Sequence, residues 1–119
     1  MLIVKPDPDN SNKEIKTLNA FLDDAPCGYI RFTMRGYIIV ITELLPLLGD
    51  PLIGSDGDEL YPILDTIIRA LGSYGLNHSC YYVECANPAL YPTLGRLRFE
   101  LKDGIMKSDL SRILKTCGH

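Results

Sequence analysis

A run of apolar, β-branched residues at positions 37–43, YIIVITE, constrains the fold of this chain more than any other segment. Both alternating sides of the run are apolar, which is typical of a strand inside a sheet that is covered on both faces. The residues before it, 28–34, alternate instead, with Ile30 and Phe32 on one side and polar or amphipathic residues between them. A short turn at 35–36 separates the two runs. The sequence therefore predicts a β-hairpin whose second strand lies inside a sheet.

Strands and helices interleave along the rest of the chain. Ser11 and Glu14 form a capping box that predicts a helix over residues 11–23, because such a pair satisfies the first free amides of a helix. A long helix is predicted from about Leu60 and should end at Gly72 or Gly75. Further elements are predicted as strands at 1–5, 79–85, 99–102 and 105–107, a helix or turn-helix at 87–98, and a last short helix that Asp109 caps. The fold class is therefore α/β or α+β with a mixed sheet.

Length and charge exclude several classes of protein. The chain has 119 residues, of which 46% are apolar and 23% charged, as in one globular domain rather than a disordered or fibrous chain. Its net charge of −3 argues against nucleic acid as a partner, since phosphate binding needs a clustered basic surface. No apolar run reaches the ~20 residues of a membrane span, and the N-terminus lacks the basic leader of a signal peptide. We expect a cytoplasmic location and no membrane contact.

The four cysteines, Cys27, Cys80, Cys85 and Cys117, include no CxxC pair. Cys80 and Cys85 lie five residues apart in a predicted strand, which places them on opposite faces and prevents them from sharing a metal ion. We therefore expect reduced thiols and no metal site.

An acidic stretch that is rich in glycine and proline precedes the long helix. Its carboxylates belong to Asp50, Asp56, Asp58 and Glu59. They suit two interpretations: the 50–59 loop could hold a divalent cation or a basic partner, or the acids could stabilise the positive end of the following helix. No phosphate-binding P-loop, HExxH or GxSxG motif accompanies them.

The order and spacing of short segments from Cys27 onward resemble the GNAT superfamily of N-acetyltransferases. The matching pieces are GYIRF at 28–32, YIIVITE at 37–43, a long helix that ends with SYG at 73–75, YVE at 82–84, NPA at 87–89 and LRF at 97–99. The resemblance covers about residues 27 to 107. It implies a GNAT-like, mixed and mostly antiparallel sheet with helices on both faces. It also implies one domain over 1–119, with a reduced strand-helix piece at 1–26, a family-like core at 27–107 and a C-terminal helix at 108–119.

The resemblance implies acetyl-CoA as the cofactor, held in a wedge between two splayed parallel strands, 38–43 and 79–84. The backbone of the first strand would face the pantetheine arm, and the amides that open the long helix would bind the pyrophosphate, as helix N-termini do. The implied cofactor-binding residues are Ile41, Thr42, Glu43, Ser55, Asp56, Gly57, Asp58 and Asn87. For catalysis it implies Tyr91 as the acid that protonates the leaving thiolate, and Glu43 or Glu84 as the base.

The sequence departs from the family pattern at two places. Three acids, Asp56, Asp58 and Glu59, stand where the family places glycines and an Arg or Gln. A carboxylate ~5.5 Å from a phosphate charge costs about 3 kcal/mol at an effective dielectric of 20, and the helix end returns only about 0.3–2 kcal/mol. The family's tyrosine acid falls on Leu94, while Tyr91 lies three residues earlier, about one helical turn away.

Three functions remain open on these residues. The first is a GNAT-like domain that has lost normal acetyl-CoA binding and acts as an interaction or regulatory module. The second is a small acyl-CoA-dependent N-acetyltransferase that acts on an amine of a small molecule or protein. The third is an α/β domain that binds a cation or a partner through the acidic 50–59 loop. An exposed sheet edge would allow a homodimer in any of them.

Overall fold

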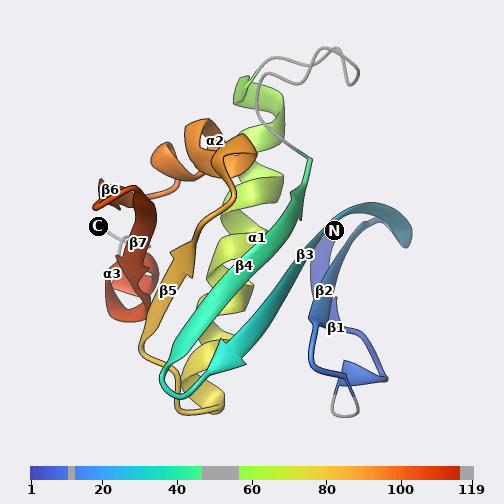
Figure 1. Cartoon of the computed structure of the whole chain (residues 1–119). Coiled ribbons are helices and arrows are strands. Elements are labelled where there is room, and N and C mark those ends of the chain that lie inside the picture. Colours follow the sequence, from blue (N-terminus) through green and yellow to red (C-terminus); the bar gives the residue numbers. More distant parts are fainter. Residues whose placement is uncertain (11–12, 47–56, 116–119) are drawn as a thin grey trace.

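The computed structural model describes residues 1–10, 13–46 and 57–115, without the side chains of residues 57–60 and 115. One seven-stranded sheet runs through it in the order β1-β2-β3-β4-β5-β7-β6 (Figure 1). The strands are β1 (Leu2–Pro6), β2 (Lys16–Leu22), β3 (Ala25–Arg35), β4 (Ile38–Leu45), β5 (Tyr82–Cys85), β6 (Glu100–Lys102) and β7 (Ile105–Asp109). The helices are α1 (Gly57–Asn77), the 3-10 helix η2 (Pro88–Leu90), α2 (Tyr91–Gly95) and α3 (Leu110–Lys115).

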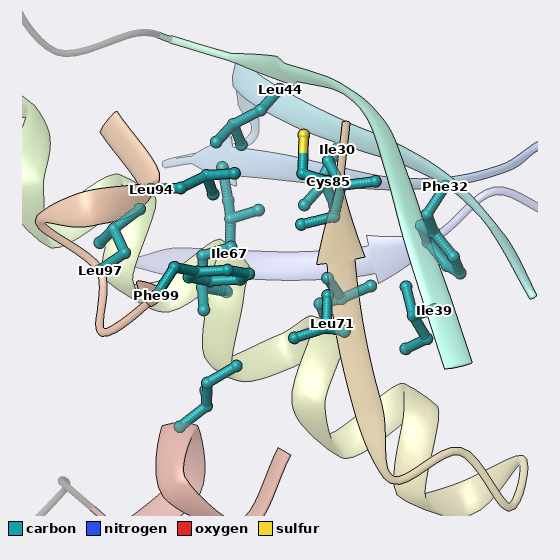
Figure 2. Close-up of a cluster of buried hydrophobic side chains, with 14 of the residues drawn as sticks. Ile30, Phe32, Ile39, Leu44, Ile67, Leu71, Cys85, Leu94, Leu97 and Phe99 are labelled. Atoms are coloured by element: carbon teal, nitrogen blue, oxygen red, sulfur yellow. The ribbon is translucent and has the colours of Figure 1, made fainter. Parts of the chain in front are cut away.

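Neighbouring strands are antiparallel throughout, except that β4 and β5 are parallel. This arrangement confirms the predicted fold class, a mixed and mostly antiparallel sheet. α1 connects the two parallel strands, as the crossover of a parallel pair requires. Figure 2 shows the core that forms between α1 and the sheet, where Phe32, Ile39 and Ile67 are fully buried.

In the described residues the helices lie on one face of the sheet rather than on both. α3 packs on α1, where Leu114 lies beside Gly72 and Leu110 beside Gly75, and α2 approaches Met106 on the same face. On the opposite face no side chain of the sheet is buried. We call this the open face; its residues are Ile3, Lys5, Thr17, Asn19, Phe21, Tyr29, Arg31, Thr33, Arg35, Ile38, Val40, Glu43, Leu45, Tyr82, Glu84, Glu100, Lys102, Ile105, Lys107 and Asp109.

The helix predicted over residues 11–23 is wrong. Residues 16–22 form β2, which pairs antiparallel with both β1 and β3. Leu18 and Ala20 are buried on the core face, two residues apart, as in a strand. Ile15, which the predicted helix would have buried, is 51% exposed. The Asn10 side chain holds the start of β2, since its amide donates to Thr17 O (2.8 Å) and accepts from Thr17 N (2.9 Å). The segment 1–26 therefore supplies two strands rather than a strand and a helix.

The predicted end of the long helix at Gly72 or Gly75 is also wrong, because α1 continues to Asn77. Gly75 serves close packing instead: a Cβ there would lie 2.5 Å from Ile39 Cδ1 and 2.7 Å from Leu110 Cδ1. The glycine thus lets α1 approach β4 and α3 together. α1 has 21 residues, yet across the described ranges no helix is long and apolar enough to cross a membrane.

Both predicted hairpins are confirmed. β3 and β4 meet at a turn in which Gly36 has φ +57°. β6 and β7 meet at Asp103 and Gly104, which both have positive φ (53° and 82°), as a type I′ turn requires. The predicted cap of the last helix is confirmed as well, since Asp109 Oδ1 accepts from Arg112 N at 2.8 Å.

Arg98 stands in the middle of the LRF segment at 97–99, and its backbone has φ +74°. That left-handed conformation favours glycine and costs a side-chain-bearing residue about 1 kcal/mol or more. Arg98 makes a compensating contact, because its guanidinium donates to Asp65 Oδ1 at 2.7 Å, and both side chains are largely buried. Asp65 also pairs with Arg69 at 3.0 Å. The loop after α2 is thereby fastened to α1.

Candidate functional site

β4 carries an extra residue near its end. Arg31 on β3 pairs with Glu43, but the next residue, Phe32, pairs with Ile41, so Thr42 has no partner on β3. This is a β-bulge, a distortion that bends a strand and is often found beside functional sites. The Thr42 hydroxyl stabilises it by donating to Arg31 O at 3.1 Å. Ile41 lies just before the bulge with its side chain 2% exposed in the core, which leaves only its backbone for a ligand.

β4 and β5 separate at this bulge. Their parallel pairing covers four positions, from Ile38 with Tyr82 to Ile41 with Cys85. β5 then ends, whereas β4 continues to Leu45. Figure 1 shows the two strands diverging toward the end of the sheet where α1 begins. We call the gap beside residues 42–45 the β4–β5 opening; within the described chain no strand pairs there with the side of β4 that faces β5.

Asn87 spans the base of this opening. Its side-chain Nδ2 lies 3.5 Å from Thr42 O, toward which it donates, and its Oδ1 accepts from Ala89 N at 3.2 Å. The second bond makes Asn87 the N-cap of η2. Thr42 and Asn87 were both predicted to bind cofactor, and the structure brings them into contact where the strands separate.

The predicted phosphate loop is described only in part. Ser55 and Asp56 lie outside the described residues, as does Asp50. Gly57 and Asp58 open α1, so the helix begins three residues earlier than the predicted Leu60. Backbone N–H groups in the first turn of a helix have no intrahelical acceptor and favour an anion.

Two carboxylates predicted as bases lie on the open face in different surroundings. Glu43 pairs with Arg31 at 2.6 Å, and the Arg31 guanidinium also lies 4.6 Å from the centroid of the Tyr29 ring. Burial, followed by the Glu43 carboxylate, raises the pKa of the Tyr29 hydroxyl. Glu84 lies on β5 between Val40 and Lys107 in the register. No hydrogen bond or ion pair of Glu84 is found among the described residues.

The hydroxyl of Tyr91, the predicted acid, is hydrogen-bonded away from β4. Its hydroxyl donates to Gly104 O at 2.7 Å, in the turn between β6 and β7. Since β5 and β7 separate that turn from β4 in the sheet order, the hydroxyl lies away from the β4 side of the opening. Leu94, one turn later, is fully buried.

The sulfur and acidic groups form no metal centre in the part of the chain that is described, where no three potential ligands among His, Cys, Asp and Glu come together. Cys27, Cys80 and Cys85 are free thiols. Burial raises the pKa of each of them, which keeps them protonated and unreactive. Cys117 and most of the acidic loop lie outside the described residues.

Sequence reasoning missed Tyr29 and Arg31 as neighbours of Glu43. The alternation in β3 placed both side chains on the outward face, so the signal for their exposure was present. Their position opposite Glu43 depends on the bulge at Thr42, which shifts the register by one residue.

Solved structures similar to this chain are GNAT acetyltransferases and related complexes. PaiA N-acetyltransferase from Thermoplasma acidophilum, in complex with coenzyme A, matches with a TM-score of 0.59 at 17% identity, over 85% of this chain and 64% of that one. A putative GNAT-family acetyltransferase from Desulfovibrio desulfuricans matches with a TM-score of 0.60 at 8% identity, over 82% and 70%. A chain of the KacTA–DNA complex matches with a TM-score of 0.56 at 11% identity, over 98% of both chains.

These likenesses show a GNAT-type fold. No protein-family model matches the sequence, and no curated protein does. The chain spans only 64% of the length of the PaiA chain.

Proposed function

We propose that this chain binds a CoA thioester at the β4–β5 opening and transfers its acyl group to an amine. The observation that carries the proposal is that β4 and β5 pair at only four positions, after which β4 runs on beside the gap. The likeness to PaiA, a structure that contains coenzyme A, supports it. Glu84, one residue before the end of β5, would supply a carboxylate for proton transfer.

The residues at the opening suit the middle of a CoA molecule. Beyond Ile41, the side of β4 that faces the gap has no strand partner in the described chain, and such backbone groups need hydrogen-bond partners. A pantetheine arm carries two amides and can pair with a strand edge as a further strand does. The thioester of a bound acyl-CoA would supply an activated acyl group. Backbone N–H groups of β4 would polarise its carbonyl.

The phosphate end of the site suits CoA less well. The first turn of α1 offers backbone amides, but Asp58 and Glu59 belong to that turn and Asp56 precedes it. Their negative charges oppose a pyrophosphate. We therefore propose that CoA binding by this chain is weak for a protein of its fold.

Glu84 is the better candidate for the base. It has no ion pair in the described chain, whereas Arg31 holds Glu43 at 2.6 Å. An amine that attacks a thioester must lose a proton as the C–N bond forms, and a carboxylate without a partner can accept it. The Tyr91 hydroxyl proton is engaged by Gly104 O, so Tyr91 is the weaker candidate for protonating the thiolate that leaves when the C–S bond breaks.

Acetyl-CoA should raise the melting temperature of the protein in a concentration-dependent way. A ligand that binds only the folded state stabilises it by mass action, by about 2.7 kcal/mol at a hundred times Kd. Differential scanning fluorimetry with 0.1–10 mM acetyl-CoA measures this, with 3′,5′-ADP as a control that lacks the pantetheine arm. A melting temperature that stays constant at millimolar acetyl-CoA contradicts the proposal.

Replacing Glu84 with glutamine should lower kcat for acyl transfer about tenfold and leave KM for acetyl-CoA unchanged, because a missing base affects the transfer step and not cofactor binding. Thiol release from acetyl-CoA with a panel of primary amines measures both constants. Glu43→Gln is the matched control and should lower kcat less, since Arg31 already neutralises Glu43. Equal effects of the two variants would contradict the role of Glu84.

A second candidate function is an interaction module that no longer binds CoA. The position of the Tyr91 hydroxyl and the acids at the start of α1 favour it. The open face favours it as well, because an uncovered sheet face is available for a partner. A folded protein whose melting temperature does not change when acetyl-CoA is added would support this function instead.

A further inference from the structure

The open face has an apolar centre where the parallel pairing of β4 and β5 begins. Ile38 and Val40 on β4 and Tyr82 on β5 lie there side by side. Tyr82 is 55% exposed, and Ile38 and Val40 are half-buried. Large apolar side chains gathered on one face are costly in water and mark interaction surfaces. In the described chain no element covers them.

Charges of opposite sign flank this apolar centre in one row of the sheet. The register aligns Arg35 on β3 with Ile38, Ile38 with Tyr82, and Tyr82 with Asp109 on β7. The row therefore reads cation, apolar, apolar, anion across four neighbouring strands. The Arg35 side chain is exposed.

Such a row is complementary to itself. A second copy, turned about a two-fold axis that runs parallel to the strands between β4 and β5, presents the same row in reverse order. Arg35 then faces Asp109 of the other copy, whose carboxylate also caps α3 through Arg112 N. Ile38 faces Tyr82. Each contact occurs twice, as in any two-fold interface.

We propose that the open face binds a second copy of this chain, with the row Arg35, Ile38, Tyr82 and Asp109 at the centre of the contact. The sheet edges suit pairing less well than the face. β6 has three residues, two of them charged, and β1 ends in Pro6, which cannot donate to a neighbouring strand. The row lies where the β4–β5 pairing begins, two residues before Glu84 on β5. The proposal does not rest on the proposed function, because it uses neither the β4–β5 opening nor the Glu84 carboxylate.

Sedimentation equilibrium of the purified chain between 5 and 200 μM tests the interface. The expected result is a reversible dimer. Tyr82→Glu and Arg35→Glu should each raise its dissociation constant at least tenfold, because the first places a charge in the apolar centre and the second sets two acids face to face. Both side chains are exposed in the monomer, so the fold should persist, which circular dichroism checks. If Tyr82→Glu fails to fold, the dissociation constant of the Arg35→Glu variant alone tests the interface.

Leu101→Glu is the matched control. Leu101 is 59% exposed, close to the exposure of Tyr82, and lies on β6 opposite Met106, on the other face of the sheet. This variant should dimerise like the unmodified chain. A monomer at 200 μM overturns the proposal and leaves the face to another partner. A dimer that both open-face variants leave intact, or that Leu101→Glu alone disrupts, overturns it too.

Discussion

Replacing Gly28 with alanine is expected to lower the free energy of unfolding by about 2–3 kcal/mol, the upper range for overpacked cores. The added Cβ would lie 2.6 Å from Leu45 O and 2.9 Å from Pro46 Cδ, and 3.3 Å from Ile67 Cδ1 on α1. The closest of these atoms is a backbone oxygen, which cannot rotate away as the end of a side chain can. The β3–β4 pair and α1 must therefore move apart. Urea denaturation, followed by circular dichroism, measures the change as a lower midpoint.

Gly95→Ala is the control for this experiment. A Cβ at Gly95 would meet only Met106 Cε, at an ordinary contact distance of 3.5 Å, and Gly95 lies in α2. Alanine favours helix over glycine by about 1 kcal/mol, so this variant should be as stable as the original or slightly more so. Equal destabilisation by both substitutions would show that the close approach at Gly28 has no special cost.

Neutralising the three acids at the start of α1 is expected to strengthen CoA binding about a hundredfold, or about 2.7 kcal/mol. The variant carries Asp56→Asn, Asp58→Asn and Glu59→Gln. Removing the repulsion of even one carboxylate near a pyrophosphate recovers an energy of this size, on the order of 3 kcal/mol at ~5.5 Å. Isothermal titration calorimetry with acetyl-CoA measures the affinity, and the gain should shrink in 0.5 M salt because salt screens exposed charges.

A second triple variant separates local from overall charge. Asp9→Asn, Glu14→Gln and Asp24→Asn change the net charge by the same amount at three exposed positions in the N-terminal part of the chain. This variant should bind acetyl-CoA like the original. If it binds as tightly as the α1 variant, the acids do not act at the phosphate position. If neither gains affinity, repulsion is not what limits binding.

The sequence predicted the elements whose local patterns agree with their surroundings. The alternation in β3 and the β-branched run in β4 are such patterns, and so is the apolar stripe of α1. The segment that forms β2 was predicted as a helix, because its helical spacing and capping box are local signals. Its pairing with β1 and β3 is a tertiary effect that a single sequence does not display.

The site was predicted in its parts but not in its geometry. Thr42 and Asn87 were named from the family resemblance, and their contact at 3.5 Å follows from where the β4–β5 pairing ends. The Arg31–Glu43 pair depends on the bulge at Thr42. The commitment of Tyr91 to Gly104 depends on how the β6–β7 turn folds back on α2. None of these three is encoded in residue spacing.

The parallel contact of β4 and β5 also bears on the order in which the domain assembles. The β3–β4 hairpin joins residues close in sequence, whereas the last β4–β5 partners are Ile41 and Cys85, with the whole of α1 between them. Closing so long a loop costs chain entropy before any contact repays it, and such non-local pairing slows folding. The hairpin can form early, and the opening takes shape only when β5 docks. We therefore expect the part of the molecule that we assign to ligand binding to form late in folding.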